Sequence, residues 1–165
     1  MENVSLRPAR PSDLDAIMTI ERQPGFEALV GRSTREEHEG MMAGPRHAYF
    51  VDERVQAFAI LRDLDDAHGN VYLKRIAVMR PGRGEGARFL SLVLDWTFAR
   101  TPAHRFHLDC FEDNARAQAM YAKLGFTRDG VLRQAYLAPD GRRRDLTLMA
   151  LLKPEWLSRA GAPAR

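Results

Sequence analysis

Hydrophobic and polar residues alternate along much of the chain, a pattern that predicts β-strands. The longest alternating segment spans 71–79, with Val71, Leu73, Ile76 and Val78 as its hydrophobic positions. The alternation slips between Leu73 and Ile76, which is typical of a β-bulge. Further strands are predicted at 4–7, 48–51, 55–62, 106–111, 131–138 and 146–152.

Four segments replace this alternation with the spacing of an amphipathic helix. The first is expected after Pro11, with Ser12 as its N-cap, and the second after a capping box at Ser33–Glu36. The third follows a glycine-rich turn at 80–86, and the fourth covers 114–124. The helices therefore lie between groups of strands.

The last two predicted strands flank Pro139-Asp140-Gly141, which indicates a hairpin. The order of elements predicts an α/β (α+β) fold, with a mixed and mostly antiparallel central sheet flanked by helices. A length of 165 residues fits one domain, which we place at 1–157, followed by a flexible tail at 158–165.

Composition narrows the class of protein. Hydrophobic residues make up 45% and charged residues 28%, as in an ordinary globular protein. The net charge of +3 reflects a small excess of arginine, and without a clustered basic face we expect no nucleic-acid partner. No apolar run suits a signal peptide or a membrane span. Cys110 is the single cysteine and no Cys/His cluster exists, so we expect a cytoplasmic protein without a metal.

The most informative segment is a strand, a glycine-rich turn and a helix, RIAVMRPGRGEGARFLSLVL from Arg75. Gly84 and Gly86 lack a β-carbon, so the backbone can bend tightly and approach a ligand. The unpaired N–H groups and positive dipole end of the following helix suit a pyrophosphate. Arg83 and Arg88 could add charge-assisted hydrogen bonds.

The same turn allows two other interpretations. It could be an ordinary helix start with a left-handed turn residue. It also satisfies the dinucleotide fingerprint G-x-G-x-x-A through Gly82, Gly84 and Ala87, with Asp109 downstream. That fingerprint normally follows the first strand of a parallel βαβ repeat, whereas this turn follows what resembles an antiparallel meander. A dinucleotide-binding oxidoreductase is therefore the weaker hypothesis.

A second motif, N-x-x-A-x-x-x-Y-x-x-x-G-F, runs from Asn114 to Phe126. Asn114 and Tyr121 are two helical turns apart, so they should share a helix face. With both motifs in place, the segment from Leu73 to Phe126 resembles the GCN5-related N-acetyltransferase (GNAT) superfamily, particularly its bacterial members. The resemblance implies an acyl-CoA acyltransferase fold, acetyl-CoA (coenzyme A) as co-substrate and a primary amine as acceptor. Homodimers are common in the family, so a homodimer is also expected.

The resemblance further implies which residues hold acetyl-CoA. The family turn R/Q-x-x-G-x-G/A corresponds here to Arg83, Gly86 and Arg88. The arginine at the last position departs from the family pattern, so its side chain must point away from the cofactor or join the phosphate site. Backbone groups of Ile76 and Val78 would pair with the pantetheine arm. The complete expected set is Ile76, Ala77, Val78, Arg83, Gly84, Glu85, Gly86, Ala87, Arg88, Asn114 and Tyr121.

Acetyl transfer needs an acid, a base and a hydrogen-bond donor that stabilises the developing oxyanion. Tyr121 matches the family tyrosine near the cofactor sulfur and could protonate the leaving thiolate, although it could also be a core aromatic residue. The backbone N–H of Val78 could stabilise the oxyanion. The base could be Asp109, Glu112 or a water molecule. Cys110 is better explained by packing than by an acetyl-cysteine intermediate.

In this family the first two helices and the final hairpin select the acceptor. Phe26, Leu29 and Tyr136 could line that pocket, although Phe26 and Leu29 could equally pack between helices. The run Arg142–Arg144 could contact an acidic acceptor or simply begin an exposed strand. A protein N-terminus, an amino acid and a small polyamine all remain open as acceptors. The alternative from another class is a non-catalytic acyl-CoA-binding sensor or structural module.

Overall fold

The computed structural model describes residues 5–160 of the chain. Strands and helices alternate along it largely as the sequence pattern predicts. In chain order, the elements of this part are β1 (Arg7–Pro8), the short 3₁₀ helix η1 (Pro11–Asp13), α1 (Leu14–Glu21), α2 (Arg35–Ala43), β2 (His47–Val51), β3 (Ala57–Arg62), β4 (Asn70–Val78), α3 (Glu85–Arg100), β5 (Arg105–Phe111), α4 (Ala115–Leu124), β6 (Thr127–Leu137), β7 (Arg143–Leu152) and α5 (Lys153–Ala160).

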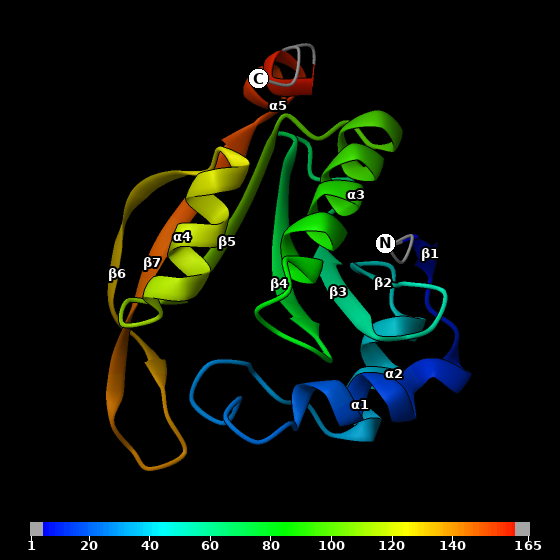
Figure 1. The fold of residues 1–165 in the computed structure, drawn as a ribbon, viewed down its shortest axis with the longest axis vertical. Helices are drawn as coiled ribbons and strands as arrows, with labels where there is room; N and C mark the ends of the chain where they lie inside the picture. Colours follow the sequence, from blue (N-terminus) through cyan, green and yellow to red (C-terminus); the bar gives the residue numbers. More distant parts are fainter. Residues whose placement is uncertain (1–4, 161–165) are drawn as a thin grey trace.

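Within the described residues, the strands form one seven-stranded sheet in the order β1-β2-β3-β4-β5-β7-β6 (Figure 1). Neighbouring strands run antiparallel except β4 and β5, which are parallel and joined by α3. The mixed, mostly antiparallel sheet flanked by helices confirms the predicted fold class.

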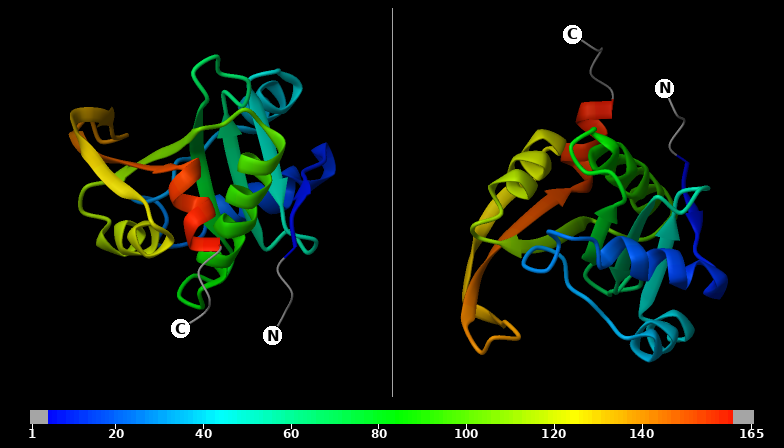
Figure 2. Two further views of the ribbon diagram at one scale, coloured as in Figure 1. Left: turned by 90° about the horizontal axis from the view of Figure 1, so that it is seen from above. Right: turned by 60° about the horizontal axis from the view of Figure 1, so that its bottom comes forward.

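Two hydrophobic cores lie on opposite faces of this sheet because successive side chains of a strand point to opposite sides. Phe50 and Leu61 belong to the core under α3 and α4, together with Leu90 and Leu94 of α3. The neighbouring residues in the strands, such as Phe58, face the core under α1 and α2. Figure 2 shows these two helix pairs on different sides of the sheet. The first face is called here the α3–α4 face and the second the α1–α2 face.

The first helix starts differently from the prediction. Ser12 is exposed and does not cap it. The side chain of Asp13 instead accepts the backbone N–H of Arg10 at 2.7 Å and pairs with Arg7 at 2.8 Å. The prediction of Ser12 as the cap was wrong because a carboxylate anchored by an arginine competes better for the free N–H groups than an exposed hydroxyl.

The second helix has a capping box, but the box lies one residue later than predicted, at Thr34–Glu37 instead of Ser33–Glu36. Thr34 accepts the N–H of Glu37 at 3.2 Å, and the Glu37 side chain accepts the N–H of Thr34 at 2.7 Å. Gly44 follows the last helical residue, in agreement with the predicted end. Ser33 is buried and takes part in a different network, described below.

The chain also contains a final helix that the sequence pattern did not predict. Helix α5 includes 158–160, where the expected tail begins, and residues 161–165 of that tail lie outside the described part. None of the helices in residues 5–160 has both the length and the apolar character needed to cross a membrane.

Candidate active site

The parallel pair β4 and β5 opens into a gap halfway along its length. The two strands pair only from Asn70 to Leu73 on β4 and from Arg105 to Leu108 on β5. Beyond these residues β4 continues to Val78 without a pairing to β5 in the described structure, and Figure 1 shows the two strands diverging. The edges that face this gap are free to pair with an extended ligand.

The predicted β-bulge lies at the narrow end of the gap. Leu61 of β3 pairs with Leu73, whereas Ile60 pairs with Arg75, so Lys74 is the extra residue. This finding confirms the irregularity expected between Leu73 and Ile76. A bulge turns the backbone and re-aims the residues beside it, and such features are common next to active sites.

The bulge is followed by backbone groups that point into the gap. The N–H of Met79 bonds to the Gln56 carbonyl at 2.7 Å on the β3 side. Because N–H groups alternate in direction along a strand, those of Val78 and Ile76 point toward the gap. The Val78 carbonyl, which also faces away from β3, accepts the Gln23 side chain at 3.2 Å. This geometry supports the predicted role of Ile76 and Val78 toward an extended ligand.

The glycine-rich turn lies at the wide end of the gap and leads into α3. Gly82 and Gly84 have φ values of 95° and 74°, which favour glycine, and Gly84 is the N-cap of the helix. Glu85 to Ala87 therefore begin the first turn of a 16-residue helix, whose N–H groups have no partners within the helix. Such donors, together with the helix dipole, suit a phosphate group, as the sequence predicts for this turn.

Arg88, the departure from the family pattern, folds back over this turn. Its Nη2 donates to the carbonyl of Arg83 at 3.3 Å, and a β-carbon on Gly84 would lie 3.4 Å from its Nη1. The sequence left open whether this side chain points away from the cofactor or lies at the predicted phosphate site. In the structure it lies beside the glycine-rich turn. It adds a positive charge there.

Sequence reasoning missed a second arginine at the turn. Arg116 lies in the first turn of α4, and a β-carbon on Gly82 would lie 3.3 Å from its Nη2. An arginine in the first turn of a helix opposes the helix dipole, which could have marked it as a residue with another role. Arg88 and Arg116 thus approach the same glycine-rich turn from two helices.

Gly86 lies where α3 passes close to α4 and β4. A β-carbon at this position would lie 3.4 Å from Sδ of Met120 on α4 and 3.8 Å from Cγ1 of Val78. The absence of a side chain therefore serves helix packing as well as access to the predicted phosphate site.

Tyr121 lies on α4 and is almost completely buried, with 6% of its surface exposed. Burial, followed by the nearby Cys110, Asp109 and Tyr72, raises the pKa of Tyr121 above its usual value. The hydroxyl is therefore protonated at neutral pH and can donate a proton or a hydrogen bond. No other described side chain or backbone group forms a hydrogen bond with it, which leaves the hydroxyl free for a ligand.

Asp109 is held by a second tyrosine on the α1–α2 face of the sheet. The hydroxyl of Tyr72 on β4 donates to Oδ2 of Asp109 at 2.8 Å across the narrow end of the gap. Leu108 and Cys110 pack toward the opposite core, so Asp109 faces away from them as the alternation suggests. This arrangement places a carboxylate beside the bulge, where an acceptor amine would need one.

The other candidate base, Glu112, is directed elsewhere. It is exposed and bonds to Arg128 of β6 at 2.9 Å. Arg128 pairs across the strands with Met149, a residue of the α3–α4 core, so the Arg128–Glu112 ion pair lies on the α3–α4 side. Asp109 faces the other side of the sheet, and the structure therefore does not bring Glu112 and Asp109 together.

The remaining candidates near the gap have structural roles. Burial raises the pKa of Cys110 to about 11, so the thiol is protonated at neutral pH and is a poor nucleophile. The side-chain oxygen of Asn114 caps α4 by accepting the N–H of Ala117 at 3.1 Å. Asn114 is thus the N-cap itself, and its amide nitrogen remains available for a ligand.

Arg144 ties together the segments that the sequence predicts to select the acceptor. Its guanidinium lies 3.7 Å from the centre of the Phe111 ring and bonds to the Ala28 carbonyl at 2.8 Å and to Asp113 at 2.7 Å. Tyr136 packs edge-on against the same Phe111 ring, with ring centres 4.9 Å apart. The loop between α1 and α2 therefore lies beside the β6–β7 hairpin, as Figure 1 also shows.

The three predicted acceptor-pocket residues do not share one environment. Leu29 is exposed at 43% on the loop that Arg144 holds, and Tyr136 lies across the hairpin. Phe26 packs against the core under α1 and α2, which agrees with its alternative interpretation as a packing residue. Leu29 and Tyr136 remain the better candidates for the pocket wall.

A buried polar cluster anchors the same loop to β4. Glu21 is fully buried and accepts Arg75 at 2.7 Å, His38 at 3.2 Å and the N–H of Ser33 at 3.3 Å. His38 also shares a hydrogen bond with the Tyr49 hydroxyl at 2.9 Å. Because Arg75 directly follows the bulge residue, this cluster fixes the loop and the bulge relative to each other.

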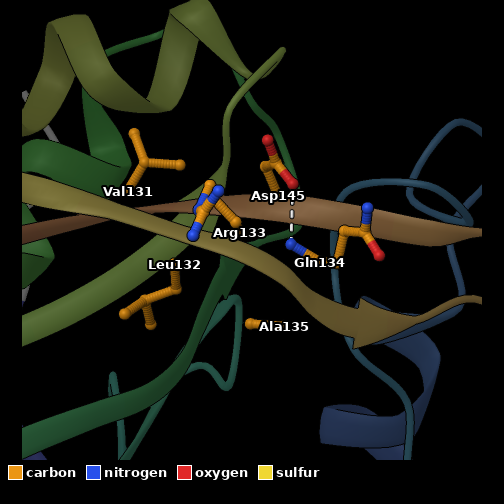
Figure 3. A pocket seen from close by; sticks show the side chains of 6 residues that line it. All are labelled: Val131, Leu132, Arg133, Gln134, Ala135 and Asp145. Carbon is orange, nitrogen blue, oxygen red and sulfur yellow. Dashed lines mark hydrogen bonds between the residues drawn. The ribbon is translucent and has the colours of Figure 1, made fainter.

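A cavity of about 720 Å³ lies away from these residues, on the irregular part of β6. It is lined by Val131, Leu132, Arg133, Gln134, Ala135 and Asp145. Figure 3 shows the Asp145 side chain bonded to the backbone N–H of Gln134, a distance of 2.7 Å. None of the predicted catalytic or cofactor residues lines this cavity, so we place the active site at the gap between β4 and β5 instead.

The topology also bears on the dinucleotide interpretation. The glycine-rich turn follows β4, which is the last strand of the antiparallel series β1 to β4. A dinucleotide fold would place it after the first strand of a parallel repeat. The fold therefore disfavours the oxidoreductase hypothesis.

Comparisons with known proteins agree with this geometry. A family model described as Acetyltransferase (GNAT) family matches residues 14–126. Spermidine N(1)-acetyltransferase of Vibrio cholerae is 27% identical over 85 residues, which cover 52% of this chain and 49% of that protein. The chain thus aligns with only about half the length of this curated relative.

Two solved structures share the fold over nearly their full length. The spermidine N-acetyltransferase of Vibrio cholerae, in complex with CoA and spermine, is 20% identical, with a TM-score of 0.79 and coverage of 93% of this chain and 98% of that one. The ribosomal-protein-S18-alanine N-acetyltransferase of Escherichia coli is 25% identical, with a TM-score of 0.73 and coverage of 91% and 94%. The gap beside a bulged strand, the glycine-rich turn and the family match together show that the chain belongs to the acetyltransferase (GNAT) family, which uses acetyl-CoA.

Proposed function

We propose that this protein transfers the acetyl group of acetyl-CoA to a primary amine by direct attack in a ternary complex. The observation that carries the proposal is the gap between β4 and β5, which has the glycine-rich start of α3 at one end and Tyr121 and Asp109 at the other. The names of the relatives support an amine as the acceptor class, since they include a spermidine N(1)-acetyltransferase and a ribosomal-protein-S18-alanine N-acetyltransferase.

The cofactor would be held along the whole gap. The N–H groups at the start of α3, with Arg88 and Arg116, would bind its pyrophosphate. Ile76 and Val78 would pair with the extended pantetheine arm through the backbone groups that face the gap. Acetyl-CoA would supply the acetyl thioester, and its reactive end would lie near the bulge.

The residues at the narrow end would then perform the transfer. Asp109, held by Tyr72, would remove a proton from the acceptor ammonium directly or through water, because only the neutral amine is a nucleophile. The N–H of Val78 would stabilise the negative charge that develops on the carbonyl oxygen. Tyr121 would donate its proton to the departing thiolate as the C–S bond breaks, and the nitrogen of the new amide would release its extra proton, through water, to restore the Tyr121 hydroxyl. No covalent enzyme intermediate is needed.

An acceptor screen tests this proposal. The protein is incubated with acetyl-CoA and amines of three kinds, namely peptides with free N-termini, amino acids and polyamines, and released thiol and acetylated product are both measured. We expect thiol release that depends on one class of amine, with a product heavier by one acetyl group. Binding of acetyl-CoA without any turnover would instead favour the non-catalytic acyl-CoA-binding module.

A homodimer and a cytoplasmic location remain predictions. The mass of the protein in solution, measured by light scattering at several concentrations, tests the first of them. Detection of the native protein with an antibody in separated cell fractions tests the cytoplasmic location.

A further inference from the structure

Lys74, the extra residue of the β4 bulge, is a partly buried cation without a bonded anion. No hydrogen bond or ion pair to it exists among residues 5–160. The charged groups around it are Arg75, Arg62, Asp109 and Glu37. Burial, reinforced by Arg75 and Arg62, lowers the pKa of Lys74. Its charge is therefore poorly compensated, and an anionic group placed beside it would be stabilised.

The neighbouring arginines cannot take the same role because each already has a partner. Arg62 bonds to Asp63 at 2.9 Å and lies 4.7 Å from the centre of the Tyr72 ring. Arg75 is 8% exposed and bonds to Glu21. Lys74 is thus the cation at the bulge whose charge remains available to a ligand.

Two carboxylates on the acceptor side are already paired with arginines, whereas a third is not. Glu21 is fully buried against Arg75, and Asp113 bonds to Arg144. Within residues 5–160, Asp109 accepts only the neutral Tyr72 hydroxyl, so it can still attract an ammonium group. The narrow end of the gap therefore presents one carboxylate and one ammonium group, both available to an acceptor.

The segments that border the acceptor side are also positive. Residues 22–34 carry two arginines and one glutamate, and residues 131–145 carry four arginines and two aspartates. Four of these six arginines are in ion pairs, whereas Arg133 and Arg143 are exposed and form no ion pair within residues 5–160. A polyamine would bring additional positive charges to this surface, and like charges repel each other. An acceptor with its own negative charge would complement it.

We infer that the acceptor is an amine that also carries a carboxylate, with its amine at Asp109 and its carboxylate at Lys74. This inference rests on the proposed function and names the substrate class of the same site. The chemistry fits a free amino acid, and it also fits the N-terminus of a peptide with an acidic residue close to it.

Matched acceptor pairs that differ only in the carboxylate test the inference. Lysine is compared with cadaverine and ornithine with putrescine, and spermidine is included as a polyamine. We expect kcat/KM for the carboxylate-bearing member to be higher by about tenfold. Equal or better turnover of cadaverine, putrescine or spermidine would overturn the inference while leaving acetyl transfer to amines intact. Absence of thiol release with every amine would overturn the proposed function as well.

A second set of acceptors distinguishes the two sources of the carboxylate. Peptides with aspartate or asparagine as the second residue are compared with the free amino acids. Preference for the aspartate peptide over both its asparagine partner and the amino acids indicates a peptide acceptor. Preference for the amino acids indicates a small-molecule acceptor. No preference for the charged member in either set contradicts the role of Lys74.

Variants at Lys74 assign the effect to this residue. Lys74→Met should bring the two members of each pair to similar kcat/KM, mainly through a higher KM for the carboxylate-bearing acceptor, whereas the KM for acetyl-CoA stays close to wild type. Lys74→Arg should retain part of the preference. Lys123→Met, at an exposed position on α4, is the matched control and should keep the full preference. Retention of the full preference in Lys74→Met would refute the inference.

Discussion

At the scale of single residues, the account depends most on Tyr121. Its ring is buried, and its hydroxyl is protonated and forms no hydrogen bond within residues 5–160, so removal of the hydroxyl should affect the proton donated to the leaving thiolate and little else. Tyr121→Phe keeps the ring that packs against Phe126 at 5.7 Å between centres. We expect a fall in kcat of about a hundredfold with nearly unchanged acetyl-CoA affinity. Steady-state kinetics with a calorimetric titration measures both, and an unchanged kcat would remove Tyr121 as the acid.

Asp109 is predicted to act on the amine. Asp109→Asn keeps the size of the side chain and can still accept the Tyr72 hydroxyl, but it cannot take a proton. The rate should fall most at low pH, where the acceptor is almost entirely protonated, and the deficit should shrink as pH rises. The measurement is the pH profile of kcat/KM, with Tyr72→Phe as a control that retains the carboxylate. Superimposable profiles for Asp109→Asn and wild type would exclude this role.

Cys110 offers a test of covalent catalysis. Since burial raises its pKa to about 11, the thiolate is scarce at neutral pH, and we expect Cys110→Ala to retain most of the activity. Loss of activity in a variant that keeps its thermal stability and its affinity for acetyl-CoA would revive an acetyl-cysteine intermediate.

At the scale of elements, the critical junction is the turn between β4 and α3. Gly86→Val should abolish acetyl-CoA binding, because the added side chain crowds both the start of α3 and Met120, which lies 3.4 Å from the position of the new β-carbon. Gly130→Val is a suitable control, since no atom lies within 4 Å of its β-carbon position. Calorimetric titration of both variants gives the answer. Normal affinity in Gly86→Val would contradict the phosphate-site assignment.

The elements also show what sequence patterns can and cannot predict. The bulge, the glycine-rich turn and the helix with Tyr121 follow from local spacing, and the structure has all three. The links from Arg144 to Ala28 and Asp113 join residues that are far apart in the chain, so no local pattern reports them. The Arg88 side chain folds back onto Arg83, five residues before it, which the spacing allows but does not require. Ser12 failed as a cap because Arg7, six residues before Asp13, holds the Asp13 carboxylate where it accepts the backbone N–H of Arg10.

At the scale of the whole molecule, the buried cluster around Glu21 joins α1, α2, β2 and β4. Breaking a buried ion pair leaves an uncompensated charge, so Glu21→Gln should lower the free energy of unfolding by about 3 kcal/mol. Urea denaturation measures this loss. Glu36→Gln on the exposed surface of α2 is the control and should change stability little. A similar stability in Glu21→Gln and wild type would mean that the cluster does not support the fold.

The same cluster predicts a dependence of stability on pH. Burial alone would raise the pKa of Glu21, but the His38 hydrogen bond and the charge of Arg75 outweigh it and lower the pKa. Its stabilising contribution is therefore present above the pKa of the unfolded chain and is lost as pH falls through the lower pKa of the folded state. The stability difference between wild type and Glu21→Gln should stay nearly constant from about pH 7 to about pH 5 and shrink as the pH falls below about 4.5, the ordinary pKa of a glutamate. A difference that grows on acidification would contradict the assignment.

A thermal-shift series with acetyl-CoA, CoA, NAD and NADP shows whether the gap between β4 and β5 binds acetyl-CoA. A ligand that binds only the folded protein raises its melting temperature, by about 5 °C or more at a concentration a hundred times the Kd. We predict stabilisation by acetyl-CoA and CoA and none by NAD or NADP. Stabilisation by NAD or NADP alone would contradict the site and the mechanism built on it.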